Sequence, residues 1–256
     1  GERTKVISGP GLRLIYLGMN MQKKPFDDPK VRLAMQYAVN KEAYGQVVYQ
    51  GNSAVPFGPL VPASTFTPKD AAPYPYDPAK ARELLKEAGY PDGFTVELLS
   101  SNLQDYVNGA TVLQSMLGQV GIKVNIQVFE PGAMNSRVSA IESAHDIFIS
   151  QWGMQTTRSA GDYWYSLFYS GSIPSSNWVR LNDPELDDLL NKAQATMEMG
   201  ERTVALQKVW DRLSALNPMV PLVVPDELYG ARKDLVGVEN LADGQINYLG
   251  NLSLEK

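Results

Sequence analysis

Short apolar runs with the composition of β-strands alternate with amphipathic stretches through the middle of this chain. The amphipathic stretches lie near 105–120 and 133–144. The strand-like runs before, between and after them are FTVELL (94–99), IKVNIQVF (122–129) and DIFISQ (146–151). This order predicts a βαβαβ unit of parallel strands joined by right-handed crossovers, and therefore an α/β fold.

Other elements precede and follow that unit. The runs LRLIYLGMN (12–20) and MVPLVV (219–224) predict buried strands. Asp-Pro pairs at 28–29, 77–78 and 183–184 combine a good N-cap residue with proline at the first helical position. Helices are therefore predicted from Pro29, from Pro78 up to Gly89, and over 183–196, and further helices over 41–49 and 201–216. The tail after Val236 is expected to be irregular.

The stretch between Gly51 and Pro78 contains seven prolines, counting Pro78 itself, which is too many for regular structure. Long loops of this kind in compact domains are usually functional or cover a neighbouring surface. We therefore expect this segment to take part in the site or in an interface.

In open α/β sheets, ligands collect beyond the carboxyl ends of the strands. That rule selects the segments 100–104, 130–134 and 151–162. The third segment combines aromatic side chains, an arginine and neutral hydrogen-bonding groups, which is typical of a recognition surface. The predicted ligand-binding residues are Ser100, Asn102, Trp152, Gly153, Met154, Gln155, Thr156, Thr157, Arg158 and Asp162. Core packing is the alternative for the next aromatic and apolar residues, which recur at helical spacing: Tyr163, Trp164, Leu167 and Phe168.

Composition narrows the function classes. The net charge is −5 and no Lys/Arg stripe occurs, so a nucleic-acid partner is not expected. No apolar run is long enough to span a bilayer. The first residues, GERTKVISGPG, contain neither an initiating Met nor the apolar core of a signal peptide. We therefore expect the chain to be a piece of a longer protein.

Signatures of enzymes and of metal sites are missing from the sequence. There is no cysteine, and the single histidine, His145, is expected on a solvated surface. The carboxylate pairs Asp27/Asp28 and Asp187/Asp188 fit exposed helix faces better than acid/base chemistry. The sequence thus predicts no catalytic residues, no cofactor and no resident metal. Direct nickel binding is disfavoured by the lack of imidazole and thiolate ligands, although a metal chelated by a small organic carrier escapes that argument.

Four segments give the chain a resemblance to a known family. They are NMQKKPFDDPKVRLAMQYAVNKEA (20–43), PYPYDPAKARELLKEAGYPDGF (73–94), GIKVNIQVFEPG (121–132) and NPMVPLVVPDELYGARKDLVGV (217–238). The chain resembles the second half of the extracellular solute-binding proteins of family 5, the peptide, nickel and glutathione class. The resemblance implies a type II periplasmic-binding-protein lobe with a mixed, largely parallel sheet flanked by helices. It further implies a hinge-proximal strand segment at 1–20, a ligand-binding lobe at 21–235 and a hinge-proximal tail at 236–256.

The same resemblance implies the working partners. Members close two lobes around a small solute, such as a peptide, and deliver it to the permease subunits of an ABC importer. This chain would then need the amino-terminal lobe of the same protein, and an isolated lobe could dimerise through the surface that lobe would cover. The implied location is periplasmic or otherwise extracytoplasmic, with or without a lipid anchor.

One position departs from the pattern of the peptide-binding members. They carry an aspartate for the ligand α-amino group three residues after the tryptophan that matches Trp152, and here that position is Gln155. Asp162 is a candidate substitute, whereas Arg158 indicates an anionic ligand. The run TTRSAGDYW is also similar to the glutathione-binding branch. Glutathione or another anionic small molecule is therefore an alternative ligand, and a hydrolase or transferase with its catalytic groups in the missing half, or a sensor, are alternative functions.

Overall fold

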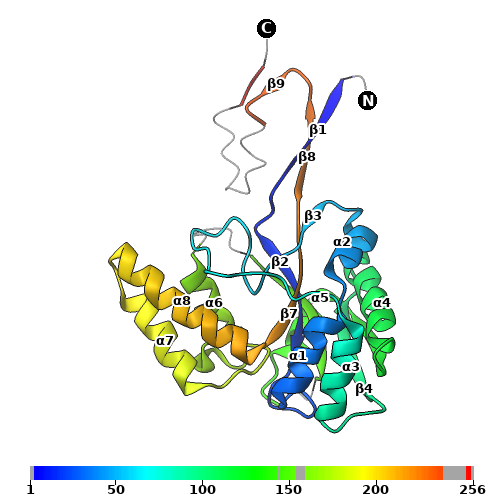
Figure 1. Cartoon of the computed structure of the whole chain (residues 1–256). Coiled ribbons are helices and arrows are strands. Elements are labelled where there is room, and N and C mark those ends of the chain that lie inside the picture. Colours follow the sequence, from blue (N-terminus) through cyan, green and yellow to red (C-terminus); the bar gives the residue numbers. More distant parts are fainter. Residues whose placement is uncertain (1–2, 143–144, 154–158, 239–251, 255–256) are drawn as a thin grey trace.

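A six-stranded mixed sheet runs through the centre of the computed structural model, which describes residues 3–142, 145–153, 159–238 and 252–254 (Figure 1). The strand order is β3-β7-β2-β6-β4-β5. In that order the strands are β3 (Ser53–Ala54), β7 (Met219–Pro225), β2 (Arg13–Met19), β6 (Ile147–Gly153), β4 (Phe94–Ser101) and β5 (Ile122–Phe129). β4 pairs in parallel with β5 and with β6, and the other neighbours are antiparallel. The predicted βαβαβ unit and mixed α/β sheet are confirmed, with parallel pairing confined to β4, β5 and β6.

Helices cover both faces of the sheet (Figure 1). One apolar cluster joins the sheet to α1 (Pro29–Ala38), α2 (Lys41–Tyr49), α3 (Pro78–Glu87) and α4 (Gln104–Gly118). A second cluster on the opposite face joins it to α5 (Pro131–Val138), α6 (Ala160–Phe168), α7 (Pro184–Ala195) and α8 (Met199–Leu216). Side chains alternate between the two clusters along the central strands β2 and β6, so that Phe148 enters one cluster and Ile147 and Ile149 enter the other.

The three Asp-Pro pairs begin helices as predicted. The side chain of Asp28 accepts a hydrogen bond from Lys30 N at 2.7 Å, that of Asp77 from Lys80 N at 2.9 Å, and that of Asp183 from Leu186 N at 2.8 Å. Each cap satisfies an amide that has no partner inside its helix.

The helix predicted over 133–144 is shorter and begins earlier than expected. α5 begins at Pro131, because the Glu130 carboxylate accepts hydrogen bonds from Gly132 N and Ala133 N and so caps the helix. It ends at Val138, and Ser139 follows as the C-cap. Glutamate is an uncommon N-cap residue, which is why the sequence pattern did not indicate this start.

A two-stranded ribbon outside the main sheet was not predicted. β1 (Thr4–Gly9) and β8 (Glu227–Arg232) pair antiparallel from Thr4–Arg232 to Gly9–Glu227 and project from the body (Figure 1). Their side chains alternate only between exposed and half-buried, so neither run has the apolar face by which a strand is recognised. The remaining short elements are β9 (Leu235–Val236), β10 (Ser253–Leu254) and the 3₁₀ turn η1 (Ser170–Ser172).

The proline-rich segment forms a long loop with only the short strand β3, and it packs on the α6/α8 side of the sheet. The indole Nε1 of Trp164 donates a hydrogen bond to Pro59 O at 2.7 Å. Gly58 lies so close to Trp210 that an added Cβ would come within 2.2 Å of the indole ring. The loop is therefore fixed to two tryptophans of the second apolar cluster.

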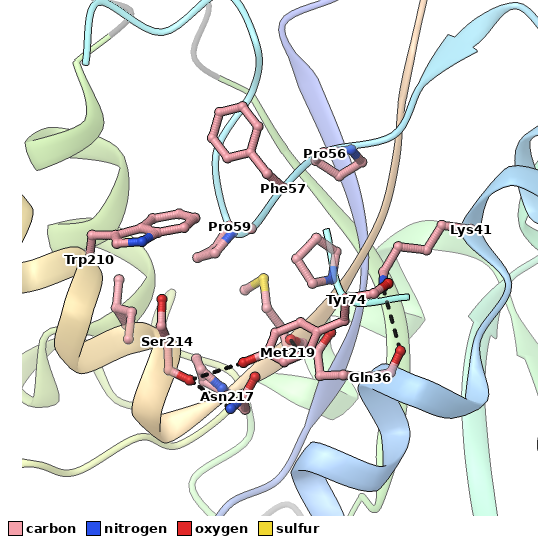
Figure 2. Close-up of a pocket in the computed structure, with 14 residues that line it drawn as sticks. Gln36, Lys41, Pro56, Phe57, Pro59, Tyr74, Trp210, Ser214, Asn217 and Met219 are labelled. Carbon is pink, nitrogen blue, oxygen red and sulfur yellow. Dashed lines mark hydrogen bonds between the residues drawn. The ribbon is translucent and has the colours of Figure 1, made fainter. Parts of the chain in front are cut away.

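A buried lysine attaches the same loop to the first layer of helices. Lys41 is 2% exposed, and its Nζ donates to Tyr74 O at 3.3 Å and to Gln36 O at 3.5 Å (Figure 2). No carboxylate of the described residues lies within 4.0 Å of it. Burial disfavours the charged ammonium and lowers the pKa of Lys41 to about 8. The cavity beside it, of about 30 Å³, has room for about one or two water molecules.

The expectation that His145 lies on a solvated surface is wrong. The imidazole is 6% exposed, its Nε2 lies 3.1 Å from Trp178 O, and its ring packs edge-on against Phe148. Burial, with Arg180 nearby, lowers the pKa of His145 to about 4. A single histidine carries no periodicity, so the sequence alone could not show that the segment around Trp178 covers it.

The Asp77 cap gives a direct stability test. Asp77→Ala removes the hydrogen bond to Lys80 N and should lower the free energy of unfolding by about 1 kcal/mol in urea denaturation. Asp92→Ala is the matched control, because Asp92 is an exposed aspartate after the same helix, and its effect should stay within about 0.5 kcal/mol. Equal losses in both variants would contradict the role given to the cap.

Because Lys41 is buried under the proline-rich loop, we expect the stability of the fold to depend on pH. Between the folded pKa near 8 and the ordinary value of 10.5, the unfolded chain holds more protons, so stability should rise with pH in that window. Over this pH window, the free energy of unfolding of the wild-type chain should rise by up to about 3 kcal/mol more than that of Lys41→Met. Urea unfolding of both proteins at several pH values from 7.5 to 10.5 measures the difference. Parallel profiles would show that Lys41 titrates normally in the folded state.

Candidate functional site

The carboxyl ends of three parallel strands meet at one edge of the sheet. Ser101 at the end of β4 is paired with Phe129 at the end of β5, and Asn102 N donates to Phe129 O at 2.7 Å. Gly153 at the end of β6 lies opposite Arg13, the first residue of β2. The β1–β8 ribbon leaves the body from this same edge (Figure 1). We call the described residues of 100–104, 130–134 and 151–162 the strand-end surface.

The two predicted residues after β4 have different environments. Ser100 is fully buried, and its Oγ donates to Tyr106 O at 3.2 Å, so its side chain connects the strand end to α4 and does not reach the surface. Asn102 is exposed at the start of the next turn. Of the two, Asn102 is the one that a solute could contact.

The last three residues of β6 are Gln151, Trp152 and Gly153, which offer a side-chain amide, an indole and a backbone without a side chain. Trp152 is half-buried and packs against the second apolar cluster, whereas Gln151 and Gly153 are exposed. Gln151 Oε1 accepts a hydrogen bond from Arg13 Nη1 at 2.7 Å. Of the other predicted contacts in this segment, Met154, Gln155, Thr156, Thr157 and Arg158 lie outside the described residues.

The aromatic residues that follow belong to the core. Tyr163, Trp164, Leu167 and Phe168 are at most 3% exposed, so core packing, the alternative considered for these four, is confirmed. Their burial orients α6 so that Asp162, in its first turn, stays half-buried at the surface. The side chains that anchor the proline-rich loop thus also determine where Asp162 lies.

Asp162 lines a cavity of about 320 Å³ between α6, α8 and the proline-rich loop. The volume lies near the lower end of the range for small-molecule sites. One Asp162 oxygen accepts a hydrogen bond from Gln194 Nε2 at 3.0 Å. The half-buried Arg202 of α8 lines the same cavity, and its Nη2 donates to Ser159 Oγ at 3.3 Å.

Sequence reasoning missed Arg13 and Arg202. Arg13 is the only charged residue in the apolar run 12–20, and that exception was a usable signal. Arg202 lies on an ordinary amphipathic helix 40 positions beyond Asp162, and nothing local in the sequence associates the two. Only the packing of α8 beside α6 brings them to one cavity.

The described part of the chain contains neither a cluster of metal ligands nor a membrane-spanning helix. No group of three or more His, Asp or Glu side chains is placed to hold a metal ion. Among those same residues, no helix has the length and apolar character needed to cross a membrane.

Comparison with known sequences gives a consistent result. The model of a family described as bacterial extracellular solute-binding proteins, family 5 middle, matches residues 1–174. The glutathione-binding protein GsiB of Salmonella paratyphi A is 36% identical over 245 residues, which cover 92% of this chain and 47% of that protein. GsiB of Escherichia coli K12 is 35% identical over the same shares of the two chains. The chain thus spans about half the length of the curated relatives it matches.

Solved structures are similar over the whole chain. The periplasmic binding protein DppA of Helicobacter pylori, in complex with the peptide STSA, has a TM-score of 0.85 at 30% identity over 99% of this chain and 49% of that one. A dipeptide-binding protein of Pseudoalteromonas sp. SM9913, in complex with Met-Leu, has a TM-score of 0.84 at 26% identity over 100% and 51%. These similarities confirm the predicted type of lobe.

Proposed function

The chain belongs to the bacterial extracellular solute-binding proteins of family 5, and we propose that it is one lobe of a protein that captures a small peptide or peptide-like solute for an ABC importer. Family membership confirms the prediction that the chain is not an enzyme, and it leaves the hydrolase or transferase alternative without support. It also agrees with an extracytoplasmic location.

The observation that carries the proposal is the position of the strand-end surface beside the β1–β8 ribbon. The chain enters through β1 and leaves through β8 at the same edge where β4, β5 and β6 end. A second lobe attached through that ribbon would face the strand-end surface, and a solute between the lobes would contact it. The segment 1–20 and the tail 236–256 then lie near the hinge, and 21–235 is the ligand-binding lobe.

The groups on this surface suit a solute with amide and charged groups. Asn102 and Gln151 offer neutral hydrogen bonds, Trp152 offers apolar area, and Arg13 offers a guanidinium. Met154 to Arg158 follow Gly153 in the sequence and, although they lie outside the described residues, they remain part of the proposed contact set. Transfer to permease subunits follows from the family, and dimerisation of the isolated lobe stays a prediction.

Glutathione or a related anionic peptide is the second candidate ligand. Relatives at 35–36% identity are glutathione-binding proteins. In this chain Arg13 has a neutral amide as its described partner, and no carboxylate of the described residues lies within 4.0 Å of it. A guanidinium in that state favours a solute that carries a carboxylate.

The proposal is tested by ligand-dependent thermal stabilisation of the complete protein. Di- to pentapeptides, glutathione, a sugar and nickel form the panel. A true ligand at 100 times its Kd should add about 2.7 kcal/mol to the free energy of unfolding and raise the Tm. Stabilisation by sugar or nickel alone, or by no member of the panel, would contradict peptide capture.

A substitution on the strand-end surface then locates the site. Asn102→Ala should weaken binding of the stabilising peptide about two- to tenfold in calorimetric titration, because one neutral hydrogen bond is lost. Asn125→Ala is the matched control, since Asn125 is exposed within β5 away from the strand ends. Equal affinity in both variants would place the peptide elsewhere.

A further inference from the structure

A buried amide oxygen beside Lys41 has no hydrogen-bond partner within the described residues. It is Oε1 of Gln36, a residue of α1 that is 2% exposed. The amide nitrogen of the same side chain donates to Met219 O at 2.7 Å. That bond excludes the flipped amide, which would place Oε1 against a carbonyl oxygen. A buried acceptor without a partner is uncommon in folded proteins, because it loses its hydrogen bonds to water and gains none in return.

The ammonium group of Lys41 has an unused donor in the same place. It carries three N–H groups. Its bonds to Tyr74 O at 3.3 Å and to Gln36 O at 3.5 Å are both longer than a usual N–H···O bond. No carboxylate of the described residues lies within 4.0 Å of Nζ. At least one N–H group of this buried ammonium therefore has no partner in the described part of the chain.

The side chains of these two residues line one small cavity (Figure 2). Its volume of about 30 Å³ is at least twice the roughly 10–15 Å³ that one water molecule needs. Much of the remaining lining is apolar and includes Pro59, Leu213 and Met219. Ser214 lines the cavity as well, and its hydroxyl group can donate or accept. The cavity thus joins a donor and an acceptor that both lack partners in a space of molecular size.

We propose that this cavity binds one water molecule that bridges Lys41 and Gln36. The water oxygen accepts a hydrogen bond from Lys41 Nζ, and one water hydrogen is donated to Gln36 Oε1. The hydroxyl group of Ser214 supplies a third partner, which is the usual number for a buried water molecule. The site lies beneath the proline-rich loop and apart from the strand-end surface, so it does not depend on the proposed function.

The polar groups of the cavity select water over other small occupants. Burial lowers the pKa of Lys41 to about 8, so the side chain is still mostly charged at neutral pH and repels a cation. A halide or another anion would face Gln36 Oε1, which cannot turn away without breaking the bond to Met219 O. An apolar gas atom would leave both polar groups without partners. Water alone accepts and donates at once and is small enough to fit.

The bridging water connects four segments of the fold at one point. Gln36 belongs to α1 and holds the start of β7 through Met219 O. Lys41 is the first residue of α2 and holds the proline-rich loop through Tyr74 O. Since Gln36 and Lys41 are each only 2% exposed, the water molecule leaves only when one of these segments moves. We therefore expect it to stay in place far longer than water on the protein surface.

A crystal structure of the complete protein gives the direct test. Density for a water oxygen should appear within about 2.7–3.2 Å of both Lys41 Nζ and Gln36 Oε1. Crystals held under xenon pressure should take up no xenon at this position, because xenon enters cavities that are dry and apolar. Xenon in the cavity, an ion bonded to Lys41, or a protein donor bonded to Gln36 Oε1 would each overturn the proposal.

Substitutions test in solution which groups hold the water. Magnetic relaxation dispersion of water ¹⁷O counts the molecules that stay inside a protein much longer than surface water does. Gln36→Met and Lys41→Met each remove one polar partner and keep a side chain of similar length. Each should therefore lower the number of long-lived water molecules by one relative to the wild-type protein.

Matched controls show whether that loss is specific. Gln46 of α2 and Lys86 of α3 are exposed, so Gln46→Met and Lys86→Met should leave the number of long-lived water molecules unchanged. Thermal unfolding should show that all four variants are folded. If Gln36→Met and Lys41→Met both keep the wild-type number, the bridge does not exist. If either variant fails to fold, the crystal structure of the wild-type protein decides the question by itself.

Discussion

Parallel strands cannot be joined by a tight turn, so the chain between β4 and β5, and between β5 and β6, must cross the sheet through α4 and α5. Each crossing returns the chain to the same starting edge, and all three strands therefore end at the opposite edge. The backbone leaves the sheet at this edge and exposes N–H and C=O groups that would be hydrogen-bonded if strand pairing continued. The position of the strand-end surface is thus a consequence of strand direction before any particular side chain is considered.

Aromatic packing on the α6/α8 side then determines what surrounds that surface. Trp164 is buried beneath the proline-rich loop and binds it through Pro59 O, while Trp210 packs against Gly58. Since Trp164 belongs to α6, the same contacts fix the first turn of that helix and with it Asp162. The position of Asp162 and the position of the long irregular loop therefore both depend on the packing of these tryptophans.

The sequence predicted the elements whose signals are local. Asp28, Asp77 and Asp183 each cap the helix expected of them, and the alternation of strand and helix from Phe94 to Gly153 gave the parallel unit. It did not predict features that depend on contacts far along the chain. The burial of His145 comes from a segment more than 30 residues away, and Arg202 meets the α6 cavity only because two helices pack together. The β1–β8 ribbon joins the two ends of the described body, and neither strand has an apolar face of its own.

That ribbon also limits how anything attached to it can move. Its six residue pairs run without a register shift from Thr4–Arg232 to Gly9–Glu227. Sliding one strand along the other would break these pairs together and turn each side chain to the opposite face. Bending the ribbon out of its own plane leaves the pairs intact and needs only small changes in backbone torsion. A domain attached to this ribbon can therefore rotate toward the strand ends or away from them, but it cannot slide along the ribbon.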